Sequence, residues 1–314
     1  MEKRRRSVTV VGGVNVDIGG RPFRPLIPRD SNPGTVRVSL GGVGRNIAHN
    51  AALLKIPVRF LTAFGIDSHA LAIEASCAEL QIDIHRARKV PGISTSTYLY
   101  LSDEEGNMVL AVSDMEICRL IDAAYLAEQQ DILDRAEIVA SDTNIPEESV
   151  RYLADHVRAP LFFDPVSVAK AGKLRSCLDR IHTLKPNLAE AEALSGVPIT
   201  DRDSIVRAGE ALLEMGLTRV FISAGADGVY AAEDGHRGFM PSCPAHPVNA
   251  TGAGDSFMAG LIYAYLEGMN LRDTAAFAAA AAALTVESEE TVNPDLSPDA
   301  VWERAGEAGQ WRAV

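Results

Sequence analysis

The chain has 314 residues, of which 47% are hydrophobic and 23% are charged, and its formal net charge is −12 at pH 7. This length and apolar content suffice for a soluble protein with a sizeable core, in one large α/β domain or two ordinary ones. The acidic balance argues against a nucleic-acid partner, because such partners require a basic face or stripe.

Apolar runs and cysteines narrow the classes further. The longest apolar run, residues 275–286, is shorter than the roughly 20 residues that cross a bilayer, so we expect a buried, alanine-rich helix and no membrane partner. None of the four cysteines has the spacing of a zinc site or a disulfide framework. The basic cluster at residues 4–6 lacks a cleavage pattern, which predicts a solvated terminus and a cytoplasmic protein.

Short apolar runs alternate with helical patterns along the chain. The runs predict strands at residues 8–11, 58–62, 138–140, 161–163, 181–184 and 219–222. Helical spacing predicts helices at residues 45–54, 70–80, 147–156, 188–194, 205–215 and 256–267. This alternation is typical of an α/β fold with a central, mostly parallel sheet flanked by helices.

Two stretches interrupt the alternation. Residues 19–40 are rich in proline, arginine and polar residues, and residues 84–113 carry alternating segments around a turn at 105–107. Together they predict a small β-sheet inserted into a single domain that spans residues 1–314. Such a sheet beside a cleft could be a lid that excludes water during group transfer, or a surface meander without that role.

The segment 248–256 holds the first candidate for catalysis, because it runs directly into an apolar helical pattern. Gly252, Ala253 and Gly254 offer free N–H groups at a helix N-terminus, where they could hold the charge of a transferred phosphate. Asp255 could take the proton from an attacking hydroxyl as a general base. The segment also fits a plain glycine turn with Asp255 as a helix cap.

Two further clusters suit a polar substrate. Gly42 belongs to a glycine pair that lets the backbone approach a ligand closely, and the Asn46 amide could serve sugar hydroxyls, although a plain glycine turn fits as well. Asn15 and Asp17 follow the first predicted strand, near the edge where open α/β sheets bind ligands. The Asp17 carboxylate could accept hydrogen bonds from vicinal hydroxyls, or complete a turn.

Nucleotide and metal candidates follow two later strands. Asn187 and Glu190 share a helix face and could order Mg²⁺ and its waters near phosphates. The same pair fits a helix N-cap with a capping-box glutamate, and both roles are compatible. Ser223, Gly225 and Gly228 form a flexible segment that could approach nucleotide phosphates.

Two common nucleotide-binding motifs are missing from the sequence. It contains neither a GxxxxGK[ST] phosphate loop nor a GxGxxG after the first predicted strand. P-loop enzymes and dinucleotide-dependent oxidoreductases are therefore disfavoured.

The motifs occur in one order over nearly the whole chain, and that order resembles the ribokinase-like, or PfkB, family of carbohydrate and nucleoside kinases. The TGAGD segment at residues 251–255 is the most specific element. The resemblance implies a mostly parallel sheet flanked by helices, a β lid over the sugar, and phosphate transfer from MgATP to a primary hydroxyl. Lids of this family often build homodimers, which predicts a homodimer through the lid.

The resemblance also implies roles by position. Asp255 is the catalytic base, and the anion hole consists of the amides of Gly252, Ala253 and Gly254. The substrate contacts are Asn15, Asp17, Gly42 and Asn46. The residues near the nucleotide are Asn187, Ser223, Gly225, Gly228 and Thr251. Mg²⁺ is influenced indirectly by Asn187 and Glu190.

A closer likeness narrows the substrate. Bacterial pseudouridine kinases, a branch of the family, are similar in residues 30–34, 41–48, 164–167, 181–187 and 293–297. The likeness implies MgATP-dependent phosphorylation of the 5′-hydroxyl of pseudouridine. Asp30, Ser31 and Asn32 lie in the expected lid and carry the donors and acceptors that a uracil-like base requires, or they form a polar turn.

Alternatives stay open at this stage. The same mechanism could serve ribose, fructose or another nucleoside, and the fold could carry a noncatalytic sugar-binding protein. Many family members have Asp where this chain has Asn249, and that Asp helps bind K⁺ close to Thr251 and the anion hole. Asn249 brings no charge, which weakens the expectation of K⁺ activation.

Overall fold

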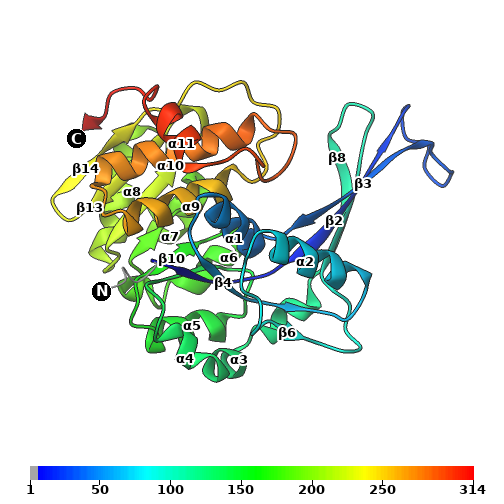
Figure 1. Cartoon of the computed structure of the whole chain (residues 1–314). Helices are drawn as coiled ribbons and strands as arrows, with labels where there is room; N and C mark the ends of the chain where they lie inside the picture. The colour runs from blue at the N-terminus through cyan, green and yellow to red at the C-terminus, as the bar shows by residue number, and fades with distance from the viewer. Residues whose placement is uncertain (1–5) are drawn as a thin grey trace.

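Figure 1 shows the computed structural model of the chain, which describes residues 6–314. Arg4 and Arg5 of the basic cluster lie outside the described residues, and Arg6 is exposed. A nine-stranded sheet forms the centre of the molecule, in the order β15-β14-β13-β12-β11-β10-β9-β1-β4.

The strands from β4 to β12 in this order run parallel to their neighbours. They are β4 (Val58–Leu61), β1 (Val8–Val11), β9 (Ile138–Asp142), β10 (Leu161–Asp164), β11 (Thr183–Leu184) and β12 (Arg219–Ser223). Antiparallel strands extend one edge, namely β13 (Val229–Glu233), β14 (His236–Met240) and β15 (Arg312–Ala313). The predicted mostly parallel sheet is thus confirmed, with each predicted strand overlapping an observed one.

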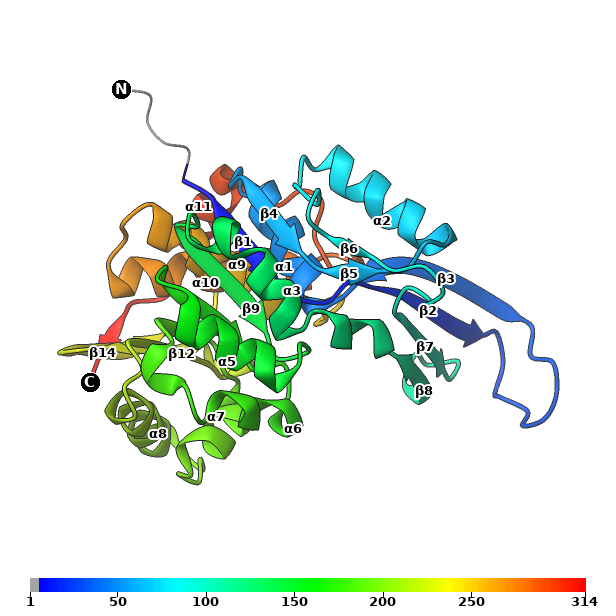
Figure 2. The same ribbon diagram turned by 90° about the horizontal axis from the view of Figure 1, so that it is seen from below.

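Helices cover both faces of this sheet (Figures 1 and 2). One layer contains α1 (Val43–Leu53), α2 (Ser68–Glu79), α9 (Ala253–Leu266), α10 (Leu271–Val286) and α11 (Pro298–Ala305). The other contains α3 (Ala123–Glu128), α4 (Gln130–Leu133), α5 (Glu147–His156), α6 (Val168–Ala171), α7 (Leu188–Ser195) and α8 (Arg202–Glu214). Successive strand residues point to opposite faces, so Val10 packs into the core of the first layer and Val11 into that of the second.

The predicted alanine-rich helix is α10, which is largely buried against α9. The two helices approach closely because Gly260 of α9 has no side chain: a Cβ there would lie 2.7 Å from the Cα of Ala278. Within residues 6–314, every helix falls short of the length and apolar character needed to cross a bilayer.

A second, smaller sheet projects from the body (Figure 1) and confirms the predicted insertion. Its order is β3-β2-β7-β8, with β2 (Asn15–Pro22), β3 (Gly34–Gly41), β7 (Thr97–Ser102) and β8 (Met108–Asp114). We call it the small sheet. It begins earlier than expected, at Asn15, and the first part of the stretch 84–113 lies elsewhere, since β6 (Arg88–Lys89) pairs with β5 (Ala63–Phe64).

Candidate active site

Motifs that are far apart in the sequence meet where the carboxyl ends of the parallel strands face the N-termini of α1 and α9. The Asn46 side chain on α1 donates a hydrogen bond from Nδ2 to Oδ2 of Asp255 on α9, at 2.8 Å, although the two residues are 209 positions apart. The Arg45 amide donates to the Gly13 carbonyl at 3.2 Å and so ties the start of α1 to the end of β1. The structure therefore brings two predicted site residues into direct contact.

The N-terminus of α9 has the geometry expected of an anion site. Gly252 precedes the helix with φ of 85°, and a Cβ there would lie 1.9 Å from the Thr291 carbonyl oxygen, so glycine is required. The amides of Asp255 and Ser256 donate to the Gly252 carbonyl, at 3.1 and 3.0 Å. Within residues 6–314, the amides of residues 252–254 donate no hydrogen bond, so these N–H groups are available to an anion at the positive end of the helix dipole.

Asp255 is buried, with 8% of its surface exposed. Burial raises the pKa of Asp255 to about 8, and the negative charge of Asp164 acts in the same direction. The hydrogen bond from Asn46 and the positive charge of Lys185 lower the pKa of Asp255 and limit the rise. A carboxylate with a pKa close to neutral pH is well suited to accept a proton from a hydroxyl.

A buried ion pair that sequence reasoning did not single out lies beside Asp255. Lys185 follows β11 directly and Asp164 ends the neighbouring β10, and their Nζ and Oδ2 atoms are 3.0 Å apart. Burial is the largest influence and opposes the charge of Lys185, but the attraction and hydrogen bond of Asp164, together with the charges of Glu190 and Asp255, raise the pKa of the ammonium. The sequence does offer one indication of this pair. Both residues stand at the ends of adjacent parallel strands, and such residues share one edge of the sheet.

A third carboxylate at this edge is Asp142, which ends β9 opposite Asp164 in the register. It is fully buried, and burial raises its pKa to about 6. Its Oδ2 atom has no hydrogen-bond partner among the described residues. The site thus gathers three carboxyl groups, and the charges of Asp164 and Asp142 both raise the pKa of Asp255.

The predicted substrate residues meet at the start of the small sheet. Asn15 donates from Nδ2 to Oδ1 of Asp17 at 2.5 Å, and burial raises the pKa of Asp17. The Asp17 carboxylate lies against Gly41, where a Cβ would be 2.1 Å from Oδ2. Gly42 has φ of 97°, and a Cβ there would be 2.7 Å from the Gly13 carbonyl oxygen, so only glycine lets the loops approach this closely.

A cavity of about 430 Å³ lies between the small sheet and the loop before α9. Gly19, two residues beyond Asp17 on the same strand face, lines it together with Tyr100. Arg37 and Glu289 also line the cavity, and their ion pair, with 3.6 Å between Nη1 and Oε2, joins the small sheet to the body.

Asn187 and Glu190 form the predicted capping box at the start of α7. Asn187 Oδ1 accepts the Glu190 amide and Glu190 Oε2 accepts the Asn187 amide, both at 2.9 Å. Glu190 is 3% exposed, and burial raises its pKa. In the part of the chain that the structure describes, no group of three or more His, Cys, Asp or Glu residues could hold a metal ion. These residues therefore fit Mg²⁺ only indirectly, through water and phosphate oxygens.

The predicted nucleotide segment lies beside this capping box. The Ser223 amide at the end of β12 donates to the Pro186 carbonyl at 2.9 Å, and Ser223 pairs with Asn187 in a parallel bridge. Gly228 has φ of 94°, and a Cβ there would be 2.1 Å from the Met240 carbonyl oxygen. Gly225, with φ of 58°, faces open space. The structure thus places Asn187, Ser223 and Gly225 close to one another at the carboxyl edge of the sheet.

Asp30, Ser31 and Asn32 are not brought to this site. They lie in the loop that joins the far ends of β2 and β3 (Figure 1). Asn32 forms hydrogen bonds within this loop, to the amide and carbonyl of Ile27 and to the carbonyl of Asp30. Since Asp17 is five residues before the end of β2, roughly 16 Å of strand separate it from the loop.

Asn249 and Thr251, the residues considered for K⁺, form a closed set of hydrogen bonds. Asn249 Oδ1 accepts the Thr251 amide at 2.9 Å, and Asn249 Nδ2 donates to the Glu289 carbonyl at 3.1 Å. An amide nitrogen is a donor and cannot ligate a cation. Of the Asn249 side chain, only Oδ1 could therefore serve a K⁺ ion.

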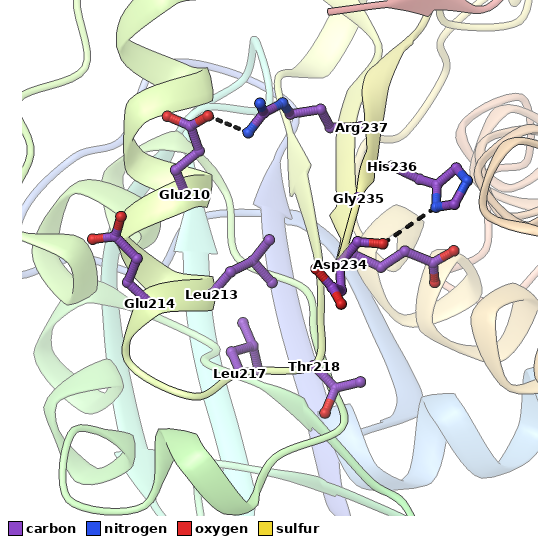
Figure 3. Close-up of a pocket in the computed structure, with 10 residues that line it drawn as sticks. Glu210, Leu213, Glu214, Leu217, Thr218, Asp234, Gly235, His236 and Arg237 are labelled. Carbon is purple, nitrogen blue, oxygen red and sulfur yellow. Dashed lines mark hydrogen bonds and ion pairs between the residues drawn. The ribbon is translucent and has the colours of Figure 1, made fainter.

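Another cavity, of about 710 Å³, lies elsewhere and is shown in Figure 3. It is lined by the end of α8 and the turn between β13 and β14, where Arg237 pairs with Glu210. Thr218, at its floor, precedes the amino end of β12, whereas the site residue Ser223 stands at the carboxyl end. This cavity contains none of the predicted site residues.

Comparisons with known proteins agree with this geometry. The sequence pattern of the pfkB family carbohydrate kinases matches residues 5–298. The chain is 38% identical to the pseudouridine kinase of Escherichia coli over 92% of this chain and 93% of that protein. It is also 38% identical to YeiI, an uncharacterized sugar kinase of Escherichia coli, over 92% of this chain and 81% of that protein.

A solved structure extends the likeness to three dimensions. Arabidopsis thaliana ribokinase complexed with ribose and ATP superposes with a TM-score of 0.85 at 25% identity, covering 96% of this chain and 98% of that one. The chain therefore belongs to the pfkB family of carbohydrate kinases and is an ATP-dependent kinase.

Proposed function

We propose that this enzyme phosphorylates the 5′-hydroxyl of pseudouridine with MgATP, using Asp255 as the general base. The observation that carries the mechanism is the buried Asp255 carboxylate, held by Asn46 beside the free amides of the α9 N-terminus. The substrate rests on the similarity to Escherichia coli pseudouridine kinase over most of both chains.

The transfer needs one proton acceptor and one site for negative charge. The 5′-oxygen attacks the γ-phosphorus of ATP, its proton passes to the Asp255 carboxylate, and the bond from the γ-phosphorus to the β,γ-bridging oxygen breaks to release ADP. The amides of Gly252, Ala253 and Gly254 stabilise the charge on the transferred group. No covalent enzyme intermediate is required.

The ribosyl part of the substrate binds at the start of the small sheet. Asn15, Asp17, Gly42 and Asn46 contact its hydroxyls, and the base enters the cavity beyond Asp17. Tyr98 and Tyr100 pair in register with Asp17 and Gly19, so both aromatic side chains share the strand face of Asp17. An aromatic ring beside the sugar site suits a planar base, which stacks on it. The small sheet would close over this substrate as a lid.

ATP binds at the neighbouring strand ends. Ser223, Gly225 and Gly228 border the nucleotide, and Thr251 lies next to the anion hole. Asn187 and Glu190 would hold the waters of a Mg²⁺ ion bound with the phosphates, and the ion would supply positive charge that neutralises the phosphates. Dependence on MgATP also favours a cytoplasmic location.

The partner proposed for the small sheet is a second copy of the chain. Val38, Ile18, Leu99 and Val112 face one another in register across its four strands and form one apolar row. Val38 is 62% exposed and Val112 is 59% exposed. The opposite face, with Asp17 and Arg37, is turned to the body. An apolar face that is this exposed favours a homodimer through the small sheet.

The proposal is tested by ADP release from MgATP with pseudouridine, uridine, adenosine, ribose and fructose as acceptors. We expect the highest kcat/KM for pseudouridine and a product phosphorylated at the 5′-position. A higher kcat/KM for ribose or fructose would reject the substrate while leaving the kinase mechanism intact. Release of ADP that does not depend on any acceptor is measured as the background.

A further inference from the structure

The Lys185 ammonium faces the first turn of α9. A Cβ built on Gly254 would lie 3.1 Å from Nζ of Lys185, and Lys185 as a whole is 6% exposed. The glycine at position 254 therefore leaves the ammonium next to the free amides of Gly252, Ala253 and Gly254. The buried Lys185 ammonium and the N-terminus of α9 therefore lie side by side.

A purely structural role accounts poorly for this charge. Burial of an ion pair contributes little net stability, because the loss of hydration offsets most of the attraction. Asp164 holds the ammonium from the other side, with Nζ to Oδ2 at 3.0 Å. Its second oxygen, Oδ1, accepts the Val166 amide at 2.8 Å, and Val166 has φ of 64°, a strained conformation for a β-branched residue. Such strain is typical of functional sites.

The geometry points to Lys185 as a catalytic residue that contacts the transferred phosphoryl group. Its ammonium has three N–H donors: one pairs with Asp164, and the others reach oxygens of the γ-phosphate while the amides of α9 bind it. As the bond to the bridging oxygen breaks and the bond to the 5′-oxygen forms, the phosphoryl oxygens carry the charge that Lys185 stabilises. Asp164 acts as the positioning residue. The inference rests on the proposed phosphoryl transfer but does not depend on pseudouridine.

Lys185→Met removes the charge and retains the apolar stem. We expect kcat to fall by roughly 10²- to 10³-fold, the effect of removing one preorganised donor from a developing charge, while KM for the acceptor stays unchanged. Nucleotide affinities distinguish a Lys185 that contacts the γ-phosphate from a Lys185 that only supports the fold. The variant should bind the nonhydrolysable analogue AMP-PNP more weakly than the parent enzyme does, whereas ADP, which lacks the γ-phosphate, should bind with unchanged affinity.

Lys185→Met leaves the Asp164 charge buried without its partner, which could lower activity by destabilising the fold. Two further variants control for this effect. Asp164→Asn keeps an oxygen for the Val166 amide but weakens the hold on the ammonium, so kcat should fall less than in Lys185→Met, which loses the charge itself. The double variant is neutral at both positions, so it should melt near the parent enzyme yet remain as slow as Lys185→Met. Recovery of kcat in the double variant, or equal weakening of ADP and AMP-PNP binding, would overturn the proposal. The acceptor with the highest kcat/KM in the panel is used, so a different substrate preference leaves this test valid.

Discussion

Asp255 is a residue whose surroundings oppose its own charge. It is buried near Asp164 and Asp142, and its pKa is raised from 3.8 to about 8. Lys185 is the nearby cation, and Asn46 donates the hydrogen bond that favours the ionised form. A general base must be deprotonated before it can act, so the pH dependence of the free enzyme should report this carboxyl group.

We expect kcat/KM to rise with pH and to level off above about 8. Asn46→Ala removes the hydrogen bond that lowers the pKa of Asp255, so the rise should move to higher pH in that variant.

Asp255→Asn should lower kcat by roughly 10²- to 10⁴-fold, the usual contribution of a positioned base. The measurement is a pH series of initial rates. A flat profile for the parent enzyme, or near-normal turnover of Asp255→Asn, contradicts the assignment.

Stability offers an independent readout of the same carboxyl group. The unfolded chain loses this proton near pH 3.8 and the folded chain near pH 8, so folding becomes less favourable as pH rises between these values. Asp255→Asn lacks this cost. Its melting temperature should exceed that of the parent enzyme at pH 7, and the difference should shrink toward pH 4.

Some of the candidate site residues could be predicted from the sequence, and others could not. Asp255 and Asn46 were predictable because each belongs to a local motif at the start of a helix. Asp164 and Lys185 were not, because their significance arises only when β10 and β11 lie side by side and bury both charges. Asp30, Ser31 and Asn32 have suitable donors and acceptors, but the length of β2 carries them away from Asp17.

Elements defined by local signals were predicted best. The bounds of β1 and α5 match the prediction, since each has a clear pattern of spacing. The capping box at Asn187 and Glu190 was also predictable. By contrast, the placement of β15 beside β14 depends on pairing between distant segments, which local patterns do not encode.

The loop before α9 and the loop after α10 are connected by one side chain, Asn249. Its amide links the Thr251 N–H to the Glu289 carbonyl, and the first of these loops leads into the proposed anion hole. A carboxylate at position 249 would have only acceptor oxygens, and one of them would face the carbonyl oxygen of Glu289. Two acceptor oxygens repel each other unless a cation lies between them. The asparagine makes this connection without an ion.

We therefore expect the parent enzyme to work equally well in potassium and tetramethylammonium salts. Asn249→Asp should lose activity in tetramethylammonium chloride and recover it when KCl is added, because the ion restores the connection between the loops. Asn249→Ala is the matched control, with neither the hydrogen bonds nor the charge, and should be slow in both salts. Strong K⁺ stimulation of the parent enzyme would show that the amide connection is insufficient.

At the scale of the whole molecule, the small sheet is polar on one face and apolar on the other. The polar face contacts the body through Arg37, which pairs with Glu289. The apolar row contains Val38, Ile18, Leu99 and Val112. Because strand residues alternate between faces, the positions proposed to bind substrate and those proposed to bind a partner are interleaved along the same strands.

This alternation makes the assembly testable apart from catalysis. The parent chain of 33.6 kDa should have twice that mass in solution, and Val38→Lys should have the mass of a monomer, because it places a charge at the exposed β3 end of the apolar row. Met215→Lys is the control: Met215 is also an exposed apolar residue, 43% accessible, but it lies at the end of α8. The masses are measured by light scattering over a concentration series. A monomeric parent chain, or a Val38→Lys variant that remains dimeric, would exclude the small sheet as the dimer interface. If the variant is monomeric and also loses kcat/KM, the polar face depends on the partner for its position, and the small sheet couples assembly to substrate binding.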